Sequence, residues 1–134
     1  MERPKGFTAR IEANGYTADA PWTYGTRKWS VTVVNTRTGK SVSFQYHTGP
    51  AVRETPTMLD VVQALISDGR FYEDNPTLPE FARETDREFI PNVPLHHQDP
   101  ELVKSYLTCK RHAEGMHRVF GADLDAMAEW SADS

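Results

Sequence analysis

The spacing of apolar residues changes once along this chain, and this change limits the folds open to it. In the first part, "FTARIEA", "WSVTVVN" and "SVSFQYH" alternate apolar and polar side chains, a pattern typical of half-buried strands. From "ETPTMLDVVQALISDG" onward, apolar residues recur every three or four positions, as on one face of a helix. Strands followed by helices, without alternation of the two, predict an α+β fold.

The strands should form an antiparallel meander. Residues 7–13 make the first strand, and Asn14–Gly15 is a strong tight-turn signal that would return residues 16–20 as a short hairpin partner. "WSVTVVN" and "SVSFQYH" follow on either side of the turn "TRTGK", before Gly49–Pro50 ends the sheet. We expect three or four strands over about residues 7–47, packed on the helices that follow.

The helices should number three or four, over about residues 56–130. The first would begin near Pro56 and close at Gly69, a residue type that often ends helices. A short capped helix is predicted near Leu78–Glu84. The longest should start at Asp99–Pro100 and end at Phe120, and a last short helix should follow Asp123.

The whole chain, residues 1–134, fits a single domain large enough to bury a core without disulfides. The expected core takes the strand positions that share a face and the helix positions that share a stripe. It includes Val31, Val33, Phe44, Tyr46, Val62, Leu65, Phe81, Leu102, Tyr106, Met116 and Phe120.

Composition places the chain among cytoplasmic proteins. It has one cysteine, which favours a reducing compartment, and no apolar run of about 18–20 residues that would predict a membrane span. Residues 1–50 carry seven Lys and Arg against three acids, whereas residues 51–134 carry eight against sixteen. Such asymmetry can steer a partner or a second copy, or can reflect solvated helix faces, so oligomeric state stays open.

Four of the five histidines and the only cysteine lie in "LHHQDPELVKSYLTCKRHAEGMH", residues 95–117. On a helix, Cys109 falls within the apolar stripe, where a cysteine usually acts as a small hydrophobe. His112 and His117 flank the stripe about 140° apart, so they cannot share an ion. His96 and His97 precede the helix, roughly 15 Å from Cys109. We therefore expect no metal site and no cofactor, and leave open any other role of these side chains.

No other catalytic pattern is present. The chain lacks a nucleophile elbow, a phosphate-binding glycine loop and a dinucleotide motif. His47, at a strand end, could serve as a general base only with a partner that the sequence does not supply. A small metal-dependent enzyme that uses histidines of "LHHQDPE" remains the weakest alternative, and we expect no enzyme.

Two binding hypotheses remain. Arg10, Arg27, Lys28, Arg37 and Lys40, with Trp22, Tyr24 and Trp29, could form a sheet surface that stacks single-stranded bases, although the net charge of −4 opposes it. Alternatively, Trp22, Tyr24, Arg27 and Lys28 form a protein-binding surface, because exposed aromatic and basic residues are enriched at interfaces. Trp22 could also fold down onto the core.

In order, "GFTARI", "WSVTVVN", "FQYHTGP", "ETPTMLDVVQALISD", "LPEFARE" and a late Tyr106 helix ending in "VFGADLDAMAEW" resemble a widespread family of small uncharacterised proteins of phages, prophages and other mobile elements. The resemblance covers nearly the whole chain. It departs at "REFIPNVPLHHQD", where such proteins often have a short polar turn before the long helix.

The resemblance implies a context and supplies no catalytic residues. Accessory proteins of mobile elements often act by binding a host protein, and anti-CRISPR inhibitors are a prominent group among them. The expectation is a non-enzymatic, phage-type inhibitor that binds a bacterial defence complex in the cytoplasm of the host cell.

Overall fold

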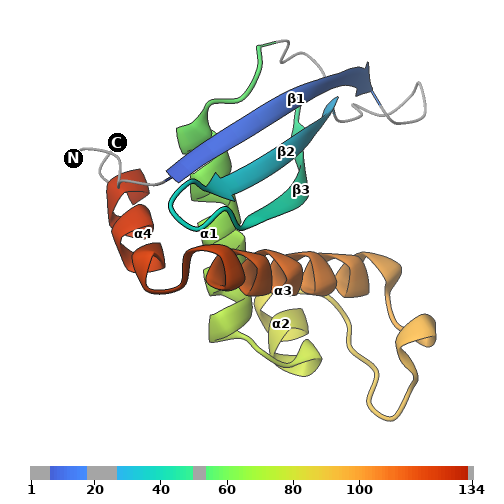
Figure 1. Cartoon of the computed structure of the whole chain (residues 1–134). Coiled ribbons are helices and arrows are strands. Elements are labelled where there is room, and N and C mark those ends of the chain that lie inside the picture. The colour runs from blue at the N-terminus through green and yellow to red at the C-terminus, as the bar shows by residue number, and fades with distance from the viewer. Residues whose placement is uncertain (1–6, 18–26, 50–53, 133–134) are drawn as a thin grey trace. The chain divides into compact units, whose positions relative to one another are not determined.

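The computed structural model describes residues 7–17, 27–49 and 54–132 of the chain, with side chains for residues 28–49 and 54–131. Strands β1 (Phe7–Thr17), β2 (Arg27–Asn35) and β3 (Ser41–Thr48) come first (Figure 1). Helices α1 (Met58–Asp74), α2 (Leu78–Glu84), α3 (Pro100–Phe120) and α4 (Leu124–Ala132) follow, with short 3-10 turns at Leu95–His97 and Gly121–Asp123. Strands followed by helices confirm the α+β class. None of the described helices is long and apolar enough to cross a membrane.

The sheet is antiparallel, in the order β1-β2-β3. Residues with buried side chains alternate along β2, from Trp29 through Val31 and Val33 to Asn35. Across the β2–β3 ladder, Val31 pairs with Phe44, which is also buried. Because alternate strand residues point to one face, the sheet has one buried side, as the period-two pattern predicts.

The predicted hairpin at Asn14–Gly15 is wrong. Both residues lie inside β1, which continues to Thr17 and pairs with β2 on both sides of them. The register shifts between Ala13, opposite Trp29, and Thr17, opposite Arg27, so β1 carries extra residues there. Glycine within a strand often marks such a bulge, and pairing with β2 overrides the local turn preference.

The described chain forms two compact units. One comprises residues 1–63 with 119–134, and the other comprises residues 64–118, so the boundary falls within α1 and α3. The prediction of a single domain over residues 1–134 stays a prediction, since compact units can be parts of one domain.

Polar contacts in the first unit join segments far apart in sequence. The Asn35 side chain, which is buried, donates a 3.0 Å hydrogen bond to the carbonyl of Val119. Arg37, in the turn after β2, forms an ion pair with Asp123 before α4. The Gln63 side chain donates to the carbonyl of Ser131 at 2.5 Å. These contacts bring the end of the chain to the β2–β3 turn and to the first half of α1.

An aromatic cluster forms the centre of the second unit. Phe81 of α2 is 1% exposed and packs edge-to-face on Phe71 of α1 and on Tyr106 of α3, with ring centroids 5.0 and 5.5 Å apart. The Tyr106 hydroxyl donates to the carbonyl of Pro76, 2.9 Å away. Ala82 and Leu102 complete the buried part of the cluster. α1 and α3 thus each pack one face against α2.

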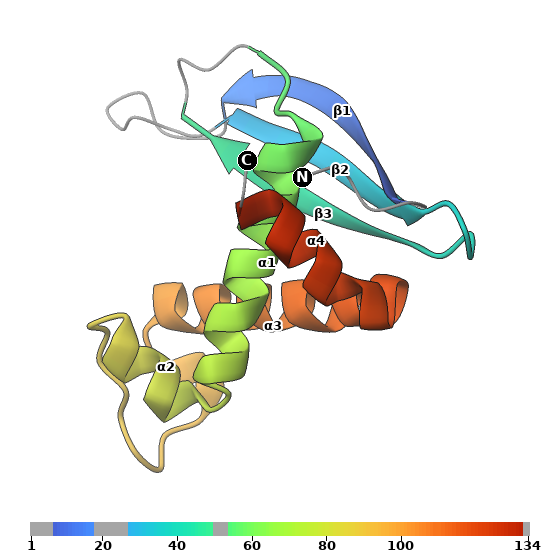
Figure 2. The same cartoon turned by 90° about the vertical axis from the view of Figure 1, so that its left-hand side faces the viewer.

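Gly69 does not end α1, contrary to the sequence prediction. The helix runs on to Asp74, and Gly69 lies buried against α3. A Cβ atom placed on Gly69 would lie 3.1 Å from the Cα of Ala113. α1 and α3 cross steeply in two perpendicular views (Figures 1 and 2). The glycine is therefore needed for close helix approach and not as a cap.

The predicted core is largely confirmed. Nine of its eleven members are buried, and Tyr46 and Tyr106 are half-buried. The structure adds Trp29, Val61, Ala113, Val119 and Met127 to the buried set. The stripe on α3 is broader than expected, because His112 is buried beside it.

Candidate functional site

The two histidines of α3 are tied to separate carboxylates on α1. His112, buried at 6% exposure, has its Nδ1 2.9 Å from a carboxylate oxygen of Asp68. The second pair lies more than one turn further along both helices. There, Nε2 of the exposed His117 is 2.5 Å from Oε1 of Glu73. The pairs flank the close contact between Gly69 and Ala113. Both histidines thus help to join α1 to α3.

Cys109 is poorly suited to act as a nucleophile. Its side chain is half-buried beside the aromatic cluster. Burial, with a smaller effect from the negative charge of Asp68, raises the pKa of the thiol from 9.0 to about 11. Because the thiolate is the reactive and metal-binding form, this environment opposes both roles at neutral pH. Cys109 therefore acts as a small packing residue.

His96 and His97 do not complete a metal site with these residues. Both are exposed in the 3-10 turn before α3, with ring centroids 4.1 Å apart. Within residues 7–17, 27–49 and 54–132, no three His, Cys, Asp or Glu side chains come close enough to hold a metal ion. His47, exposed near the end of β3, lies opposite Lys28 in the β2–β3 register.

The binding residues expected from sequence are only partly described. Trp22 and Tyr24 lie outside the described residues. Arg27 begins β2, but only its backbone is described, and the Lys28 side chain is half-exposed. The protein-binding role of this group stays a prediction.

The prediction that Trp29 belongs to a base-stacking surface is wrong. It is 1% exposed, and its indole Nε1 donates to the hydroxyl of Thr48 at 2.9 Å. A ring that faces the core cannot stack on a base. Arg37, another member of the proposed basic surface, is paired with Asp123.

A closed loop between α2 and α3 is the surface feature that sequence reasoning missed. The Gln98 side chain is 4% exposed and holds the loop from inside. Its Oε1 accepts from the backbone N–H of Ile90 at 3.0 Å, while its Nε2 donates to the carbonyls of Ile90 at 2.7 Å and of Val93 at 3.0 Å. One buried amide thus satisfies three backbone groups and fixes the path of residues 90–98.

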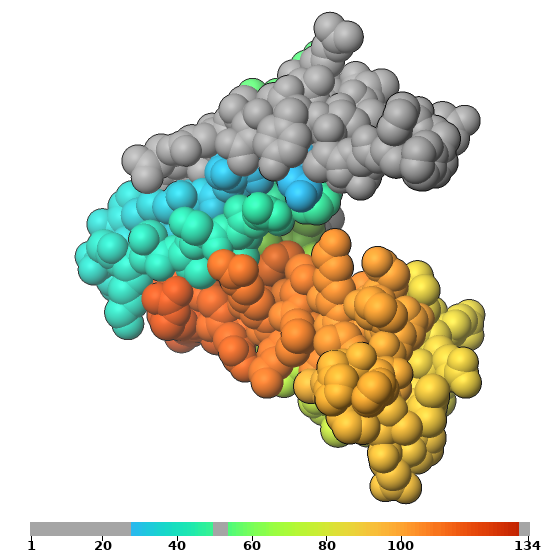
Figure 3. Space-filling model, turned by 90° about the vertical axis from the view of Figure 1, so that its right-hand side faces the viewer, coloured from blue at the N-terminus to red at the C-terminus, as the bar shows by residue number. Residues whose placement is uncertain are grey.

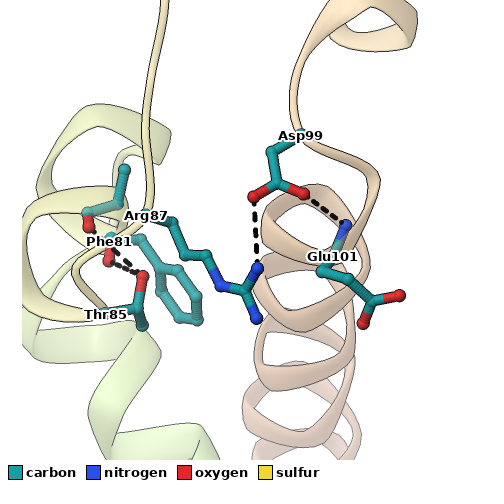
Figure 4. A network of polar contacts seen from close by, with 6 residues as sticks. Phe81, Thr85, Arg87, Asp99 and Glu101 are labelled. Carbon is teal, nitrogen blue, oxygen red and sulfur yellow. Dashed lines mark hydrogen bonds and ion pairs between the residues drawn. The ribbon is translucent and has the colours of Figure 1, made fainter.

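Charges and backbone geometry close the base of this loop. Arg87, after α2, forms an ion pair with Asp99, before α3, at 3.3 Å (Figure 4). Asp99 also accepts from the backbone N–H of Glu101, which starts the long helix. Asn92 has a φ of 63°, in the left-handed region that asparagine tolerates better than most residues. We call residues 87–99 the Gln98 loop.

The Gln98 loop exposes apolar side chains. In the described part of the chain, the exposed large hydrophobic residues are Ile90 at 42%, Leu95 at 55% and Leu107 at 48%. Two of the three belong to the loop. In Figure 3 the orange and yellow atoms of this region lie on the visible face of the second unit. The run of proline and apolar residues in "IPNVPLHHQD" was a signal for this surface, but the buried glutamine that shapes it had none.

Comparison with known proteins adds no relative from which a site could be transferred. No protein-family model, no curated protein and no solved structure matches this chain.

Proposed function

We propose that this chain is a non-enzymatic, phage-type accessory protein that acts by binding another protein, in the specific form of an anti-CRISPR-like inhibitor of a bacterial defence complex. The observation that carries the binding role is the exposure of two large apolar side chains, Ile90 and Leu95, on a loop whose backbone is fixed by hydrogen bonds to Gln98. Large apolar side chains exposed on a fixed backbone are candidates for an interaction site. The sequence resemblance to proteins of mobile elements supplies the defence context and the host cytoplasm.

The chemistry of the described side chains supports a binding role over catalysis. Burial raises the pKa of the Cys109 thiol, so this cysteine is not prepared for nucleophilic attack. The burial of Trp29 weighs against base stacking by the sheet. The proposal takes the three- or four-stranded sheet and its helices to act as one domain over residues 1–134.

The test is expression of the chain in bacterial strains that each carry one active CRISPR system, followed by challenge with a targeted phage. An inhibitor restores plaque formation in at least one strain, and a pulldown after nuclease treatment recovers a stoichiometric subunit of the same complex. Unchanged immunity in every strain would reject the anti-CRISPR form. If a Trp22→Ala, Tyr24→Ala variant folds and inhibits fully, the Trp22 surface is not the one used.

A further inference from the structure

The backbone of the Gln98 loop is more tightly constrained than a simple connection between two helices requires. It buries a polar amide, holds Asn92 at positive φ and contains Pro91 and Pro94, which restrict the backbone further. A compact loop fixed by its own side chains is frequently a functional element. Because the backbone of the loop is already fixed, the loop loses little conformational entropy when a partner binds.

Two of the side chains that this loop exposes, Ile90 and Leu95, are large and apolar. The backbone of Ile90 is hydrogen-bonded to the Gln98 side chain. Leu95 begins the 3-10 turn that leads to Gln98. Both side chains are exposed to water on a fixed backbone, although burial of their apolar surface would be favourable. A partner that offers an apolar pocket would gain this free energy.

The surroundings of the loop are acidic. Residues 78–101 carry six Asp and Glu against two Lys and Arg, and Arg87 is already paired with Asp99 inside the segment. Glu84 and Asp86, just before the loop, and Glu88, within it, are exposed. A partner must therefore bring positive charge, since complementary charges speed encounter and like charges oppose it.

These observations select among the classes of partner. Nucleic acid is disfavoured, because its phosphates would meet an acidic surface. A second copy that presents the same loop across a two-fold axis would also bring like charges together. We propose that the Gln98 loop is the contact surface for a protein partner with an apolar pocket ringed by Lys and Arg, with Ile90 and Leu95 entering the pocket.

This assignment deepens the proposed function and can be tested separately from it. A photo-reactive benzophenone amino acid replaces Leu95 in the full chain, expressed in bacteria with an active CRISPR system, and the cross-linked peptide is identified by mass spectrometry. The matched control places it at Leu107, which is equally exposed but lies on α3 outside the loop. We expect one identified partner, captured mainly at position 95 and through a basic surface.

Charge reversal tests the electrostatic part. The double variant Glu84→Lys, Glu88→Lys should reduce capture at position 95 by about tenfold or more, the effect of losing roughly 1.4 kcal/mol of binding free energy. The control double variant Asp125→Lys, Glu129→Lys changes the net charge equally at exposed positions of α4 and should leave capture unchanged.

Each outcome decides one of the two proposals. Capture of a basic surface on a protein unrelated to defence would keep the loop assignment and reject the anti-CRISPR function. Restored plaque formation without capture at position 95, or with equal capture at Leu107, would keep the function and overturn the loop assignment. Capture of a second copy of the chain, or of an acidic or neutral surface, would also overturn it.

Discussion

At the scale of single residues, the structure assigns packing roles to groups that resemble functional ones. Gly69 permits close contact between two helices, and Cys109 fills space beside an aromatic cluster. His112 and His117 each bridge α3 to a carboxylate of α1. The two histidines pair with carboxylates 44 residues away, Gly69 meets α3, and Cys109 packs on a cluster that includes Phe81 of α2, so none of these roles follows from local sequence.

Substitution Gly69→Ala should destabilise the protein by about 1–3 kcal/mol. Alanine is the better helix former by roughly 1 kcal/mol, but its Cβ would press on the backbone of Ala113, which cannot rotate away. Urea denaturation of the variant measures the balance. Ser67→Ala, at an exposed position of the same helix, is the control and should be neutral or slightly stabilising. A more stable Gly69→Ala protein would refute the close crossing.

Alkaline pH should weaken the fold through Cys109. Its pKa lies above the ordinary value, so the folded state favours the neutral thiol, and the associated stability is complete below about pH 9. That stability is lost as pH rises toward 11, the folded-state pKa. Burial also raises the pKa of Tyr106, which acts in the same direction. Denaturation at pH 8 and pH 10.5 should show a smaller loss for Cys109→Ser than for the parent, and equal losses would contradict this account.

At the scale of elements, the α2–α3 connection shows most clearly what a buried polar side chain does. Gln98→Ala should cost about 1–3 kcal/mol, because the N–H and carbonyl of Ile90 lose their partner. Hydrogen exchange of the Ile90 amide should accelerate. Gln98→Glu would place a buried carboxylate oxygen against the carbonyls of Ile90 and Val93, so exchange should accelerate at least as much. Equal protection in all three proteins would show that the loop is held by other contacts.

The aromatic cluster predicts a graded response at Tyr106. Tyr106→Phe removes the hydrogen bond to the Pro76 carbonyl and should cost about 1 kcal/mol. Tyr106→Ala also removes the ring that packs on Phe81 and should cost about 3 kcal/mol, the low end for an aromatic residue because this ring is half-buried. Equilibrium unfolding measures both. A loss below 1 kcal/mol for the alanine variant would contradict the placement of the α3 stripe.

The ends of α2 and α3 were the features that could best be predicted from sequence. α2 and α3 begin and end where sequence predicts, because Thr77 caps one and Asp99 with Pro100 starts the other. Such signals act within a few residues and need no tertiary contact. Asn14–Gly15 and Gly69 were misread because pairing with β2 and packing on α3 overrule the local preference. The Gln98 loop required knowledge of burial, which a single sequence does not contain.

At the scale of the whole molecule, the division of charge guides the choice of partner. The first 50 residues carry a net charge of +4, and the rest carry −8. Within the first group, Arg37 is neutralised by Asp123 and the sheet presents Trp29 to the core, so less of the positive half can serve nucleic acid than its composition suggests. The acidic part, residues 51–134, contains the Gln98 loop and its exposed apolar side chains, Ile90 and Leu95.

This balance predicts that the protein does not bind single-stranded nucleic acid at physiological salt. Fluorescence anisotropy of a labelled oligothymidine should stay constant on titration with the protein at about 150 mM salt, because stacking by Trp29 is prevented by its burial and the net charge of −4 repels phosphate. The Trp29→Phe variant is the informative control: since the indole faces the core, the substitution should alter thermal stability and leave the anisotropy unchanged. Saturable binding that weakens steeply with salt would return the sheet to first place as the functional surface, and would displace the Gln98 loop.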